Sequence, residues 1–580
     1  MRLLTLALDY DGTITRPDDR VDAAIRTAIA NARLRGITVV IVTGRILSEL
    51  RRAAGDLHFV DGVVAENGAV VHFPDGDHTT VIAPHVPLLF TQELERCGIA
   101  FRKGETLVDA DAAEAGRILE IIRTLELPLV LIFNKGRVMV LPQGVSKATG
   151  LHAALDTLRL SARNMLAIGD AENDHELLRL SEIGVAVPWG SASLRAAADA
   201  SFEGNAPADV AAYITAVVDK GTMPPARIPR RQLLLGYTDD GREFRLAPRG
   251  RNVLVAGDTK SGKSWVVGLL TEQLILHGYC VCVLDPEGDY RSLEALPGVT
   301  VLGGEDPPPS IGELTRALRY PDRSLVVDLS RLPQDAKVAY IRATLPGLNL
   351  LRQRTGLPHR IVIDEAHYFL HDSDGLSLLD LERNGYTVAT YCASRLPGAL
   401  LDATQVMLVT CESNPAEVEA LKRCCSARAR CDATNWEVLR GLRPGQAVAL
   451  PITDEAGGQL QFFTVAPRLT PHVRHQQKYV DVPVSAHRAF VFAPGARVCT
   501  LRELVEQLEH QPAPELEPFV KRGDFSRWIR DVFGDYVLAA ELRSIEARHR
   551  GAPSGDTVAA LVDAIRARYD LRDEVTLVAR

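Results

Sequence analysis

The sequence predicts an α/β protein with two consecutive domains, each built on a mainly parallel sheet, followed by a small and mainly helical region. Short β-branched runs such as Thr38–Val42 alternate with helical patterns, which is typical of parallel strands covered by helices. At 580 residues the chain is too long for a single hydrophobic core. Two unrelated motifs that combine glycine with charged residues, one beginning at Asp9 and one at Gly257, each follow an apolar run of strand character. Each motif therefore predicts a sheet domain of its own.

The composition is that of an ordinary globular protein, with 46% hydrophobic and 24% charged residues. No apolar run reaches the ~18 residues that a membrane span requires, and the apolar start meets Asp9 too soon for a signal peptide. The nine cysteines are too sparse for a disulfide scaffold, so we expect a cytoplasmic protein with no membrane partner. A net charge of −8 argues against a globally basic nucleic-acid binder and still permits a local basic channel.

Shifts in composition predict where the domains begin and end. A polar, Pro-rich stretch interrupts the first alternation of strands and helices and is interpreted as a linker. A second break falls near Thr470 to Asp481, after which Phe525 to Phe533 carries apolar residues at helical spacing, with Asp524 as a candidate cap. The expected divisions are residues 1–218, a linker at 219–231, residues 232–467, and a small helical region at 482–580.

The second domain shows a regular succession of β-branched runs, each short enough to be one buried strand. The predicted strands are Asn252–Ala256, Cys280–Leu284, Ser324–Asp328, Arg360–Ile363 and Thr387–Tyr391. A helical pattern over Trp265–His277 follows the first of them.

The first motif, Asp9-Tyr10-Asp11-Gly12-Thr13, stands at the carboxyl end of the opening strand. Gly12 permits a sharp turn, and Asp9 and Asp11 at alternate positions can face one crevice. One carboxylate can attack phosphorus and form an acyl-phosphate, while the other protonates the leaving oxygen and then activates water. The pair therefore predicts catalytic roles for Asp9 and Asp11.

Such chemistry also needs a hydroxyl, a cation and a metal site, and the chain offers all three further along. Thr43 ends the next strong strand and can hold a phosphate oxygen. Lys147, in Gly144-Val145-Ser146-Lys147, can balance the phosphoryl charge. The run Gly169–Asp174 follows a third strand and supplies the oxygen ligands that Mg²⁺ prefers.

This set, in this order, resembles the haloacid dehalogenase-like phosphatases, and more closely their Cof-like branch, over roughly the first 200 residues. The resemblance implies a Rossmannoid domain in which Asp9 is the nucleophile and Asp11 the general acid and base. It also implies that Thr43 and Lys147 bind the transferring phosphoryl group. The magnesium ligands that it implies are Asp9, the carbonyl of Asp11, Asp170 and Asp174.

The same resemblance implies an inserted α/β cap over about residues 81–141, which would choose the substrate. Residues expected to contact the substrate beneath the cap are Gly44, Arg45, Asn67 and Asn173. The Asp-x-Asp motif alone fits an ordinary acidic turn equally well, whereas the complete ordered set favours the catalytic interpretation. The substrate stays open among sugar phosphates, phosphoglycolate and phosphorylated nucleic-acid ends.

The second motif, Gly257 to Ser264, fits the pattern G-x-x-x-x-G-K-[ST] between a predicted strand and a predicted helix. Backbone N–H groups of such a loop, shaped by Gly257 and Gly262, cradle the phosphates of ATP at the helix N-terminus. Lys263 would reach the β- and γ-phosphates, and Ser264 would bind Mg²⁺.

A pair of acids ends a later strand and completes the second candidate site. Asp364 is expected near the magnesium ion, and Glu365 is expected to activate a water, as hydrolysis requires. The plain alternative is an acidic helix start, which stabilises a helix N-terminus by itself. The preceding phosphate-binding loop favours the catalytic interpretation.

The residues between these motifs resemble the HerA-like and FtsK-like motor ATPases over roughly residues 230 to 467. The resemblance rests on Leu284–Tyr290, on Val326–Ser330 and on the strand that ends at Asp364, and it implies a RecA-like P-loop ATPase domain. That family usually has a polar sensor, often Gln, followed by Arg and Pro. Here Ser394 takes the Gln place, and Arg395, a candidate nucleotide-binding residue, is separated from the following Pro by Leu396.

The motor-ATPase resemblance also implies a homo-oligomer, typically a hexameric ring in which an arginine completes the neighbouring subunit's site. The candidates are Arg395, Arg423, Arg428 and Arg430. The last three form a basic cluster with Lys422, which fits either a DNA channel or a solvated surface turn.

Together the motifs predict a bifunctional hydrolase: a magnesium-dependent phosphomonoesterase joined to an ATP-hydrolysing motor that acts on DNA or on a partner. Two alternatives stay open. Polynucleotide kinase–phosphatases also join this phosphatase fold to a P-loop, although Glu365 argues against a kinase. In the second alternative the P-loop domain is a non-hydrolysing nucleotide-binding scaffold that regulates the phosphatase.

Overall fold

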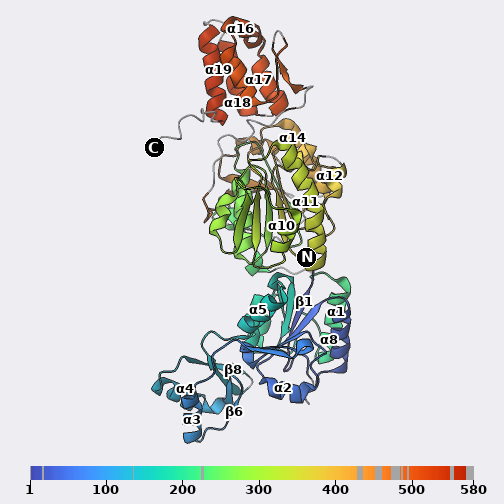
Figure 1. The fold of residues 1–580 in the computed structure, drawn as a ribbon, viewed down its shortest axis with the longest axis vertical. Coiled ribbons are helices and arrows are strands. Elements are labelled where there is room, and N and C mark those ends of the chain that lie inside the picture. Colours follow the sequence, from blue (N-terminus) through green and yellow to red (C-terminus); the bar gives the residue numbers. More distant parts are fainter. Residues whose placement is uncertain are drawn as a thin grey trace. The chain divides into compact units, whose positions relative to one another are not determined.

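The computed structural model describes residues 2–569 with several gaps. The residues left out are 16–18, 135, 224–227, 248, 372, 427–434, 451–459, 472–483, 485–487, 493–494, 534 and 549–553. The chain divides into two compact units, which are described one at a time (Figure 1). The first contains Met1–Gln232 with Ala317–Asp322 and Leu351–His359, and the second contains the remainder.

The first unit is built on an eight-stranded sheet with the order β12-β11-β10-β1-β2-β3-β4-β5 among the described residues. The strands from β12 to β3 are parallel, whereas β4 and β5 run antiparallel at one edge. The bounds are β1 Thr5–Asp9, β2 Thr38–Val42, β3 Gly62–Ala65, β4 Val70–Phe73, β5 His78–Val81, β10 Met165–Gly169, β11 Ile183–Ala186 and β12 Ala200–Ser201.

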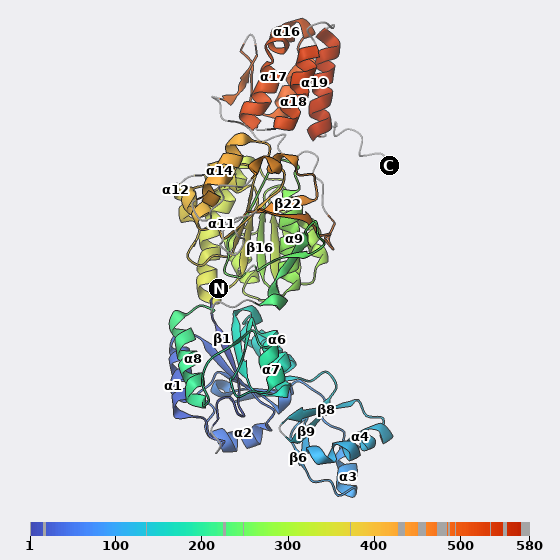
Figure 2. The same ribbon diagram turned by 180° about the vertical axis from the view of Figure 1, so that it is seen from behind.

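Helices cover both faces of this sheet because its strands are apolar on both sides. Leu6 and Leu8 of β1 belong to the core beneath α1 and α8, whereas Ala7 between them belongs to the core beneath α5 and α6. Figure 2 shows α6 and α7 on the side of the sheet opposite α1 and α8. The bounds are α1 Ala23–Leu34, α2 Leu47–Ala54, α5 Lys147–Leu158, α6 His175–Leu180, α7 Ala192–Ala197 and α8 Pro207–Lys220.

Between β5 and α5 the chain forms a smaller α/β body, called the cap below. Its antiparallel sheet has the order β6-β7-β9-β8, and α3 and α4 pack on one face around Phe90, Leu94 and Ile118. The bounds are α3 Leu88–Arg96, β6 Phe101–Lys103, β7 Val108–Asp111, α4 Ala115–Thr124, β8 Leu129–Asn134 and β9 Arg137–Pro142.

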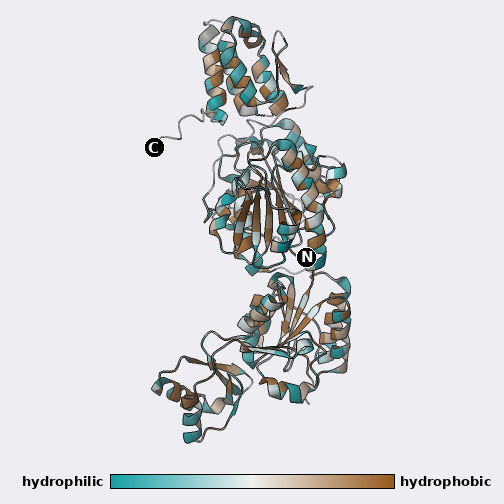
Figure 3. Ribbon diagram, in the orientation of Figure 1, coloured by the Kyte–Doolittle hydropathy of each residue, from teal (hydrophilic) through white to brown (hydrophobic). Residues whose placement is uncertain are grey.

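The second unit contains a sheet of eleven strands in the part of the chain that the structure describes. Its order is β14-β13-β23-β22-β21-β15-β20-β19-β16-β18-β17, and the strands from β21 to β17 are parallel. Figure 3 shows these central strands as a strongly apolar interior. The bounds are β13 Leu233–Tyr237, β14 Glu243–Leu246, β15 Val253–Ala256, β16 Val281–Asp285, β17 Val299–Gly303, β18 Ser324–Asp328, β19 Arg360–Ile363, β20 Tyr386–Thr390, β21 Val406–Val409, β22 Gln446–Ala449 and β23 Gln461–Val465.

All five strands predicted for this region form, with bounds that differ by one residue at most at either end. The helix predicted from Trp265 begins two residues earlier, at Lys263, because the loop that starts at Gly257 leads directly into its first turn. The bounds are α9 Lys263–Leu276, α10 Ile311–Ala317, α11 Gln334–Thr355, α12 Ser373–Ser377, α13 Gly398–Asp402 and α14 Pro415–Ser426.

The C-terminal helices pack around a core of their own that includes Leu504, Leu516, Phe525 and Ile529. The apolar face predicted over Phe525 to Phe533 is divided between α17 and a π-helical turn at Ile529–Phe533, and Gly523 precedes α17 in the cap position expected for Asp524. The bounds are β24 Phe490–Val491, β25 Arg497–Val498, α15 Leu501–His510, α16 Ala513–Arg522, α17 Asp524–Trp528, α18 Tyr536–Arg548 and α19 Ser554–Tyr569. Among the described residues, no helix has the length and apolar character needed to cross a membrane.

Candidate active sites

The first candidate site lies where the carboxyl ends of β1, β2, β3 and β10 meet. Asp9 is the last residue of β1 and points to the same side as Ala7, toward the start of α5. Ser146 caps α5, and Lys147 is its first residue. The Nζ atom of Lys147 donates hydrogen bonds to Asp9 Oδ1 at 2.5 Å and to Asp174 Oδ1 at 2.6 Å. Lys147 thus joins the carboxylates of Asp9 and Asp174, which are far apart in the sequence.

Asp174 organises the loop that follows β10. Its second oxygen, Oδ2, accepts the backbone N–H groups of Asp170 and Ala171 at 2.9 and 3.0 Å. The carboxylates of Asp9, Asp170 and Asp174 are buried, and each offers an oxygen within 4.8 Å of the others. The Oδ2 atom of Asp9 is shielded from solvent and has no hydrogen-bond partner in the described part of the chain.

These residues fit a magnesium ion on chemical grounds. Among the described residues of this cluster, three buried carboxylates face the ammonium group of Lys147, so a divalent cation would balance the remaining negative charge. Burial raises the pKa of Asp9 well above its ordinary value, and the charge of Asp174 raises it further while Lys147 opposes the shift. Burial by itself would lower the pKa of Lys147, but the charges of Asp174 and Asp9 outweigh that effect and raise it. The cluster is therefore short of positive charge without a metal.

Thr43 and the turn after β3 are joined by main-chain hydrogen bonds. Thr43 is fully buried, and its carbonyl accepts the N–H of Asn67 at 3.0 Å, while the carbonyl of Arg45 accepts the N–H of Glu66 at 2.9 Å. Asn67 Oδ1 accepts a bond from Asn173 Nδ2 at 3.3 Å, which links this turn to the loop after β10. The predicted residues Thr43, Asn67 and Asn173 thus gather around the same edge of the sheet.

Gly68 in this turn is required by a close approach of the backbone. Its φ angle is 110°, and a Cβ atom there would lie 1.8 Å from the carbonyl oxygen of Ser146. Ser146 directly precedes Lys147, so the absence of a side chain at Gly68 lets the start of α5 reach Asp9.

Asp11 is held by Arg45 on the side of the site that faces the cap. Arg45 Nε lies 2.8 Å from Asp11 Oδ1, and its Nη2 lies 2.5 Å from the same atom. Nη2 also pairs with Asp19 at 2.9 Å. Burial works against the charge of Arg45, but its hydrogen bonds to Asp11 outweigh it and raise the pKa of Arg45. Asp11 therefore faces a different space from the buried cluster around Lys147.

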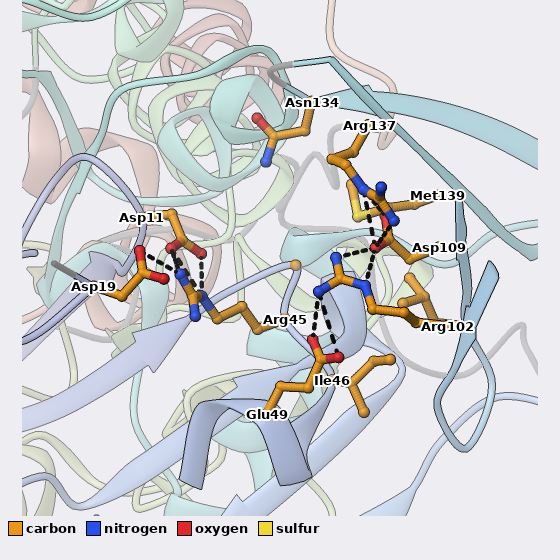
Figure 4. A pocket seen from close by; sticks show the side chains of 12 residues that line it. Asp11, Asp19, Arg45, Ile46, Glu49, Arg102, Asp109, Asn134, Arg137 and Met139 are labelled. Atoms are coloured by element: carbon orange, nitrogen blue, oxygen red, sulfur yellow. Dashed lines mark hydrogen bonds and ion pairs between the residues drawn. The ribbon is translucent and has the colours of Figure 1, made fainter. Parts of the chain in front are cut away.

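That space is a cavity of about 280 Å³ between the sheet domain and the cap (Figure 4). The lining residues from the sheet domain are Asp11, Asp19, Gly44, Arg45, Ile46 and Glu49. Those from the cap are Arg102, Leu107, Asp109, Asn134, Arg137 and Met139. Gly44 lies directly beneath the cap, since a Cβ atom there would meet the sulfur of Met139 at 3.0 Å.

Sequence reasoning missed the cap residues of this cavity. Arg102, Asp109, Asn134 and Arg137 belong to four different short strands. Polar residues at alternate strand positions normally indicate a solvated face, so only the folded arrangement shows that they gather over Asp11.

The second candidate site begins at the loop between β15 and α9. Gly257 has a φ angle of 146°, and a Cβ atom there would lie 2.2 Å from Thr410 Oγ1, while Gly262 has a φ angle of 105°. Lys263 Nζ donates to the carbonyl of Asp258 at 2.7 Å, which folds its side chain back across the loop. Both glycines are thus needed for the shape of the loop.

A loop that follows β16 meets Ser264 and Asp364. Asp285 accepts four backbone N–H groups of this loop, from Glu287 to Tyr290, at 2.7 to 3.2 Å. This turn brings Asp289 Oδ2 to 2.5 Å from Ser264 Oγ and the Tyr290 hydroxyl to 3.1 Å from Asp364 Oδ2. Asp289 was not singled out from the sequence, although it belongs to the motif that suggested the motor-ATPase resemblance.

Glu365 is fully buried at the end of β19 and has a φ angle of 48°. Its Oε2 atom lies 3.7 Å from Nδ1 of His367, which also bonds Thr390 at 3.0 Å. Because β20 lies between β15 and β19, its carboxyl end is next to both the loop after β15 and the pair Asp364 and Glu365. Ser394 and Arg395 follow that end, and Ser394 donates its hydroxyl to Glu417.

Four arginines were expected as candidates to complete a neighbouring subunit's site. Arg395 and Arg423 are exposed, and Arg428 and Arg430 lie outside the described residues.

Comparison with known proteins places these sites in context. Residues 6–85 and 105–214 match the family model of haloacid dehalogenase-like hydrolases, and residues 250–306 match that of the central domain of the helicase HerA. A phosphoglycolate phosphatase of Natronomonas pharaonis is 33% identical over 205 residues, which is 34% of this chain and 89% of the relative. A phosphoglycolate phosphatase of Methanothermobacter thermautotrophicus is 29% identical over 201 residues, covering 33% of this chain and 89% of the relative.

Among solved structures, a haloacid dehalogenase-like hydrolase from Bacteroides thetaiotaomicron aligns with 37% of this chain and 100% of its own length. The identity is 18% and the TM-score 0.31. The HerA match covers the loop after β15 and the Asp285 loop but ends before β19. The chain therefore joins a segment similar to the HerA central domain to an N-terminal unit through which it belongs to the haloacid dehalogenase-like hydrolases.

Proposed function

We propose that the first unit is a magnesium-dependent phosphomonoesterase that works through an aspartyl-phosphate at Asp9. The observation that supports this most directly is the buried cluster in which Lys147 bonds both Asp9 and Asp174, with Asp170 alongside. Asp11 stands at the adjoining cavity, where a leaving group would lie.

The reaction divides between these residues in two steps. A carboxylate oxygen of Asp9 attacks phosphorus, the bond from phosphorus to the ester oxygen breaks, and Asp11 donates a proton to that oxygen. Asp11 then takes a proton from water as the water attacks the aspartyl-phosphate, which releases phosphate and restores Asp9. Thr43 and Lys147 hold phosphoryl oxygens in both steps. Magnesium, bound by Asp9, the Asp11 carbonyl, Asp170 and Asp174, would neutralise phosphoryl charge when present.

A small ester is the substrate class that fits the cavity. A volume of about 280 Å³ is at the lower end of the range for ligand pockets. The relatives described above are named phosphoglycolate phosphatases, so 2-phosphoglycolate is the first substrate to test on this chain.

The test is phosphate release from a panel of small phosphate esters and of 3′- and 5′-phosphorylated oligonucleotides, with and without ATP. Asp9→Asn is expected to abolish release from every ester that the wild type hydrolyses. Asp77→Asn serves as the matched control, because Asp77 is exposed and has a φ angle of 42°, which asparagine tolerates well. Activity that survives in Asp9→Asn would show that the nucleophile is assigned wrongly.

We propose further that the second unit is a RecA-like ATPase. Ser264 and Asp364 would hold the magnesium of bound ATP, Lys263 would contact the β- and γ-phosphates, and Glu365 would activate water. The support is geometric: the Asp285 loop contacts both Ser264 and Asp364 through Asp289 and Tyr290.

In this proposal ATP hydrolysis drives work on DNA or on a partner, in a homo-oligomer where Arg395 or another arginine completes a neighbouring site. Light scattering with and without ATP tests the assembly. Glu365→Gln separates hydrolysis from binding, because it removes the carboxylate and keeps the size of the side chain. ATP binding without any turnover in the wild type would favour a regulatory scaffold instead. Transfer of labelled γ-phosphate to a 5′-hydroxyl oligonucleotide would favour a polynucleotide kinase.

A further inference from the structure

The cavity over Asp11 is chemically different at its two ends (Figure 4). At the end formed by the sheet domain, Arg45 is committed to Asp11 and Asp19. At the cap end, two guanidinium groups, those of Arg102 and Arg137, converge on the carboxylate of Asp109. This second cluster belongs to the cap and has no role in the two chemical steps described above.

Asp109 acts as a fixed support for both arginines. Its side chain is only 7% exposed, whereas those of Arg102 and Arg137 are 53% and 39% exposed. Arg137 Nη2 lies 2.7 Å from Asp109 Oδ2, and Nε lies 3.2 Å from the same oxygen. One carboxylate therefore orients two guanidinium groups whose outer portions remain open to the cavity.

The two arginines differ in what else they contact. Arg102 Nη1 also pairs with Glu49 of α2 at 3.2 Å, so Arg102 joins the cap to the sheet domain. The ion pairs of Arg137 with other described residues all go to Asp109 through Nε and Nη2. The remaining nitrogen of Arg137, Nη1, is thus the donor in this cluster that a ligand can use without breaking a bond between cap and sheet domain.

A second polar group of the cavity lacks a partner. The Oδ1 atom of Asn134, on the neighbouring strand β8, is shielded from solvent and bonds no described residue. A carboxylate accepts hydrogen bonds and cannot satisfy this oxygen, so it would bind Asn134 through the Nδ2 donor of the same amide. Asn134 and Arg137 are opposite each other in the register of β8 and β9, so one ligand group can reach both.

On the basis of the phosphatase proposed above, we infer that Arg137, oriented by Asp109, is the specificity-determining residue that selects esters whose leaving group carries a carboxylate. Nη1 of Arg137 can donate a charge-assisted hydrogen bond to a carboxylate, while Asp109 holds the planar guanidinium group in place. The small cavity limits the leaving group to a short acid, with the phosphate at Asp9 and the carboxylate at the cap end.

The test compares two esters of nearly equal size, 2-phosphoglycolate and 2-hydroxyethyl phosphate, which differ in having a carboxylate or a hydroxymethyl group. The wild type is expected to prefer 2-phosphoglycolate by about 10- to 100-fold in kcat/KM, the range that one charge-assisted bond provides. Arg137→Gln is expected to reduce this ratio to near one, mainly by raising KM for 2-phosphoglycolate. Arg137→Lys keeps the charge but not the planar guanidinium group that Asp109 orients, and should retain part of the preference.

Arg123→Gln is the matched control, because Arg123 is exposed on α4 of the same cap, and it should keep the wild-type ratio. The ratio compares two substrates on one protein sample, so partial unfolding of a variant cancels out. If Arg137→Gln does not fold, the kcat/KM ratio of the two esters is measured in Arg137→Lys. A ratio equal to that of the wild type in Arg137→Lys would overturn the inference.

The outcomes separate this inference from the proposed function. A wild type that hydrolyses neither ester, nor any other in the panel, contradicts the proposed phosphatase. Equal hydrolysis of both esters, or an unchanged ratio in Arg137→Gln, contradicts only the inference. A second pair, fructose 1,6-bisphosphate and fructose 6-phosphate, asks whether the second anion is a phosphate. If Arg137→Gln removes a preference in that pair and not in the first, the carboxylate assignment is wrong.

Discussion

The residue that most constrains the first site, apart from the charged ones, is Gly68. It has no side chain where a Cβ atom would overlap the Ser146 carbonyl, and the residue after Ser146 is the lysine that contacts Asp9. A side chain at Gly68 would therefore displace the backbone that carries Lys147, and with it the positive charge beside Asp9.

Gly68→Ala is expected to destabilise the first unit by about 2 kcal/mol or more and to abolish phosphatase activity, since α5 must move away from Asp9. Thermal denaturation and ester hydrolysis measure the two effects. Gly76→Ala is the control, because a Cβ atom at Gly76 has open space and should change neither. Normal activity in Gly68→Ala would show that Lys147 does not need this backbone contact.

In the second unit, Glu412 predicts a pH dependence of stability. Its side chain is buried, and burial, together with the charge of Asp258, raises its pKa from 4.5 to about 9. The folded state therefore keeps a proton that the unfolded state loses above its ordinary pKa. The contribution of protonated Glu412 to the free energy of unfolding is fully present below pH 4.5 and is lost as the pH rises to about 9.

Between pH 5 and pH 9 the free energy of unfolding should fall by up to about 1.4 kcal/mol per pH unit through this group. Glu412→Gln imitates the protonated acid, so its melting temperature should depend less on pH and exceed that of the wild type near pH 9. Parallel pH profiles for the two proteins would contradict the assignment. Glu437→Gln, on an exposed acid nearby in the sequence, should leave the wild-type profile unchanged.

At the scale of elements, the cap is joined to the sheet domain by a buried carboxylate. Glu66, in the turn after β3, accepts the N–H groups of Glu105 and Thr106 at 3.0 and 2.9 Å. Burial raises the pKa of Glu66, and the two backbone bonds oppose that shift. The loop between β6 and β7 is thereby fixed against the sheet domain next to the cavity.

Gly104→Ala tests this link, because a Cβ atom at Gly104 would lie 2.5 Å from the Glu66 carboxylate. The substitution should loosen the contact, increase amide hydrogen exchange at residues 104–107, and reduce ester hydrolysis. Gly116→Ala, on the open face of α4 in the same cap, is expected to preserve activity. Unchanged exchange in Gly104→Ala would mean that the Glu66 bonds do not hold the cap.

At the scale of the whole molecule, the described residues of each candidate site lie within one unit. The residues of the first site, between Asp9 and Asp174, lie in the first unit, and the residues of the second site, Gly257–Ser264, Asp285, Asp289, Asp364 and Glu365, lie in the second. No side chain of either described site is supplied by the other, so their chemistry should be separable in one protein.

Lys263→Ala is expected to abolish ATP binding and to leave ester hydrolysis, measured without nucleotide, at the wild-type level. Asp9→Asn is expected to do the reverse. Both activities should be measured on the full chain, with fluorescence of a labelled nucleotide for binding and phosphate release for hydrolysis. Loss of both activities in either variant would show that the sites depend on each other.

How far the sequence could predict this structure differs between its parts. The haloacid dehalogenase-like fold of the first unit was predictable and is confirmed, because strand alternation and motif order are local properties that parallel sheets preserve. Motif residues stand at strand ends, so the assembly of Asp9, Thr43 and Asp170 at one sheet edge followed from the fold. The roles given to these residues, the domain boundaries and the ATPase assignment stay predictions.

The residues of two candidate phosphate sites and their order along the strands can be read from the sequence alone, because each motif joins a strand to a turn over a few residues. Which side chains meet around the two candidate sites depends on tertiary packing. Arg45 pairs with Asp11, Asp109 pairs with both Arg102 and Arg137, and Asp289 accepts a hydrogen bond from Ser264. These contacts depend on how separate strands and loops pack, so no periodic pattern in the sequence indicates them. Packing therefore decides the surroundings that would select a substrate, whereas local motifs already indicate the reaction.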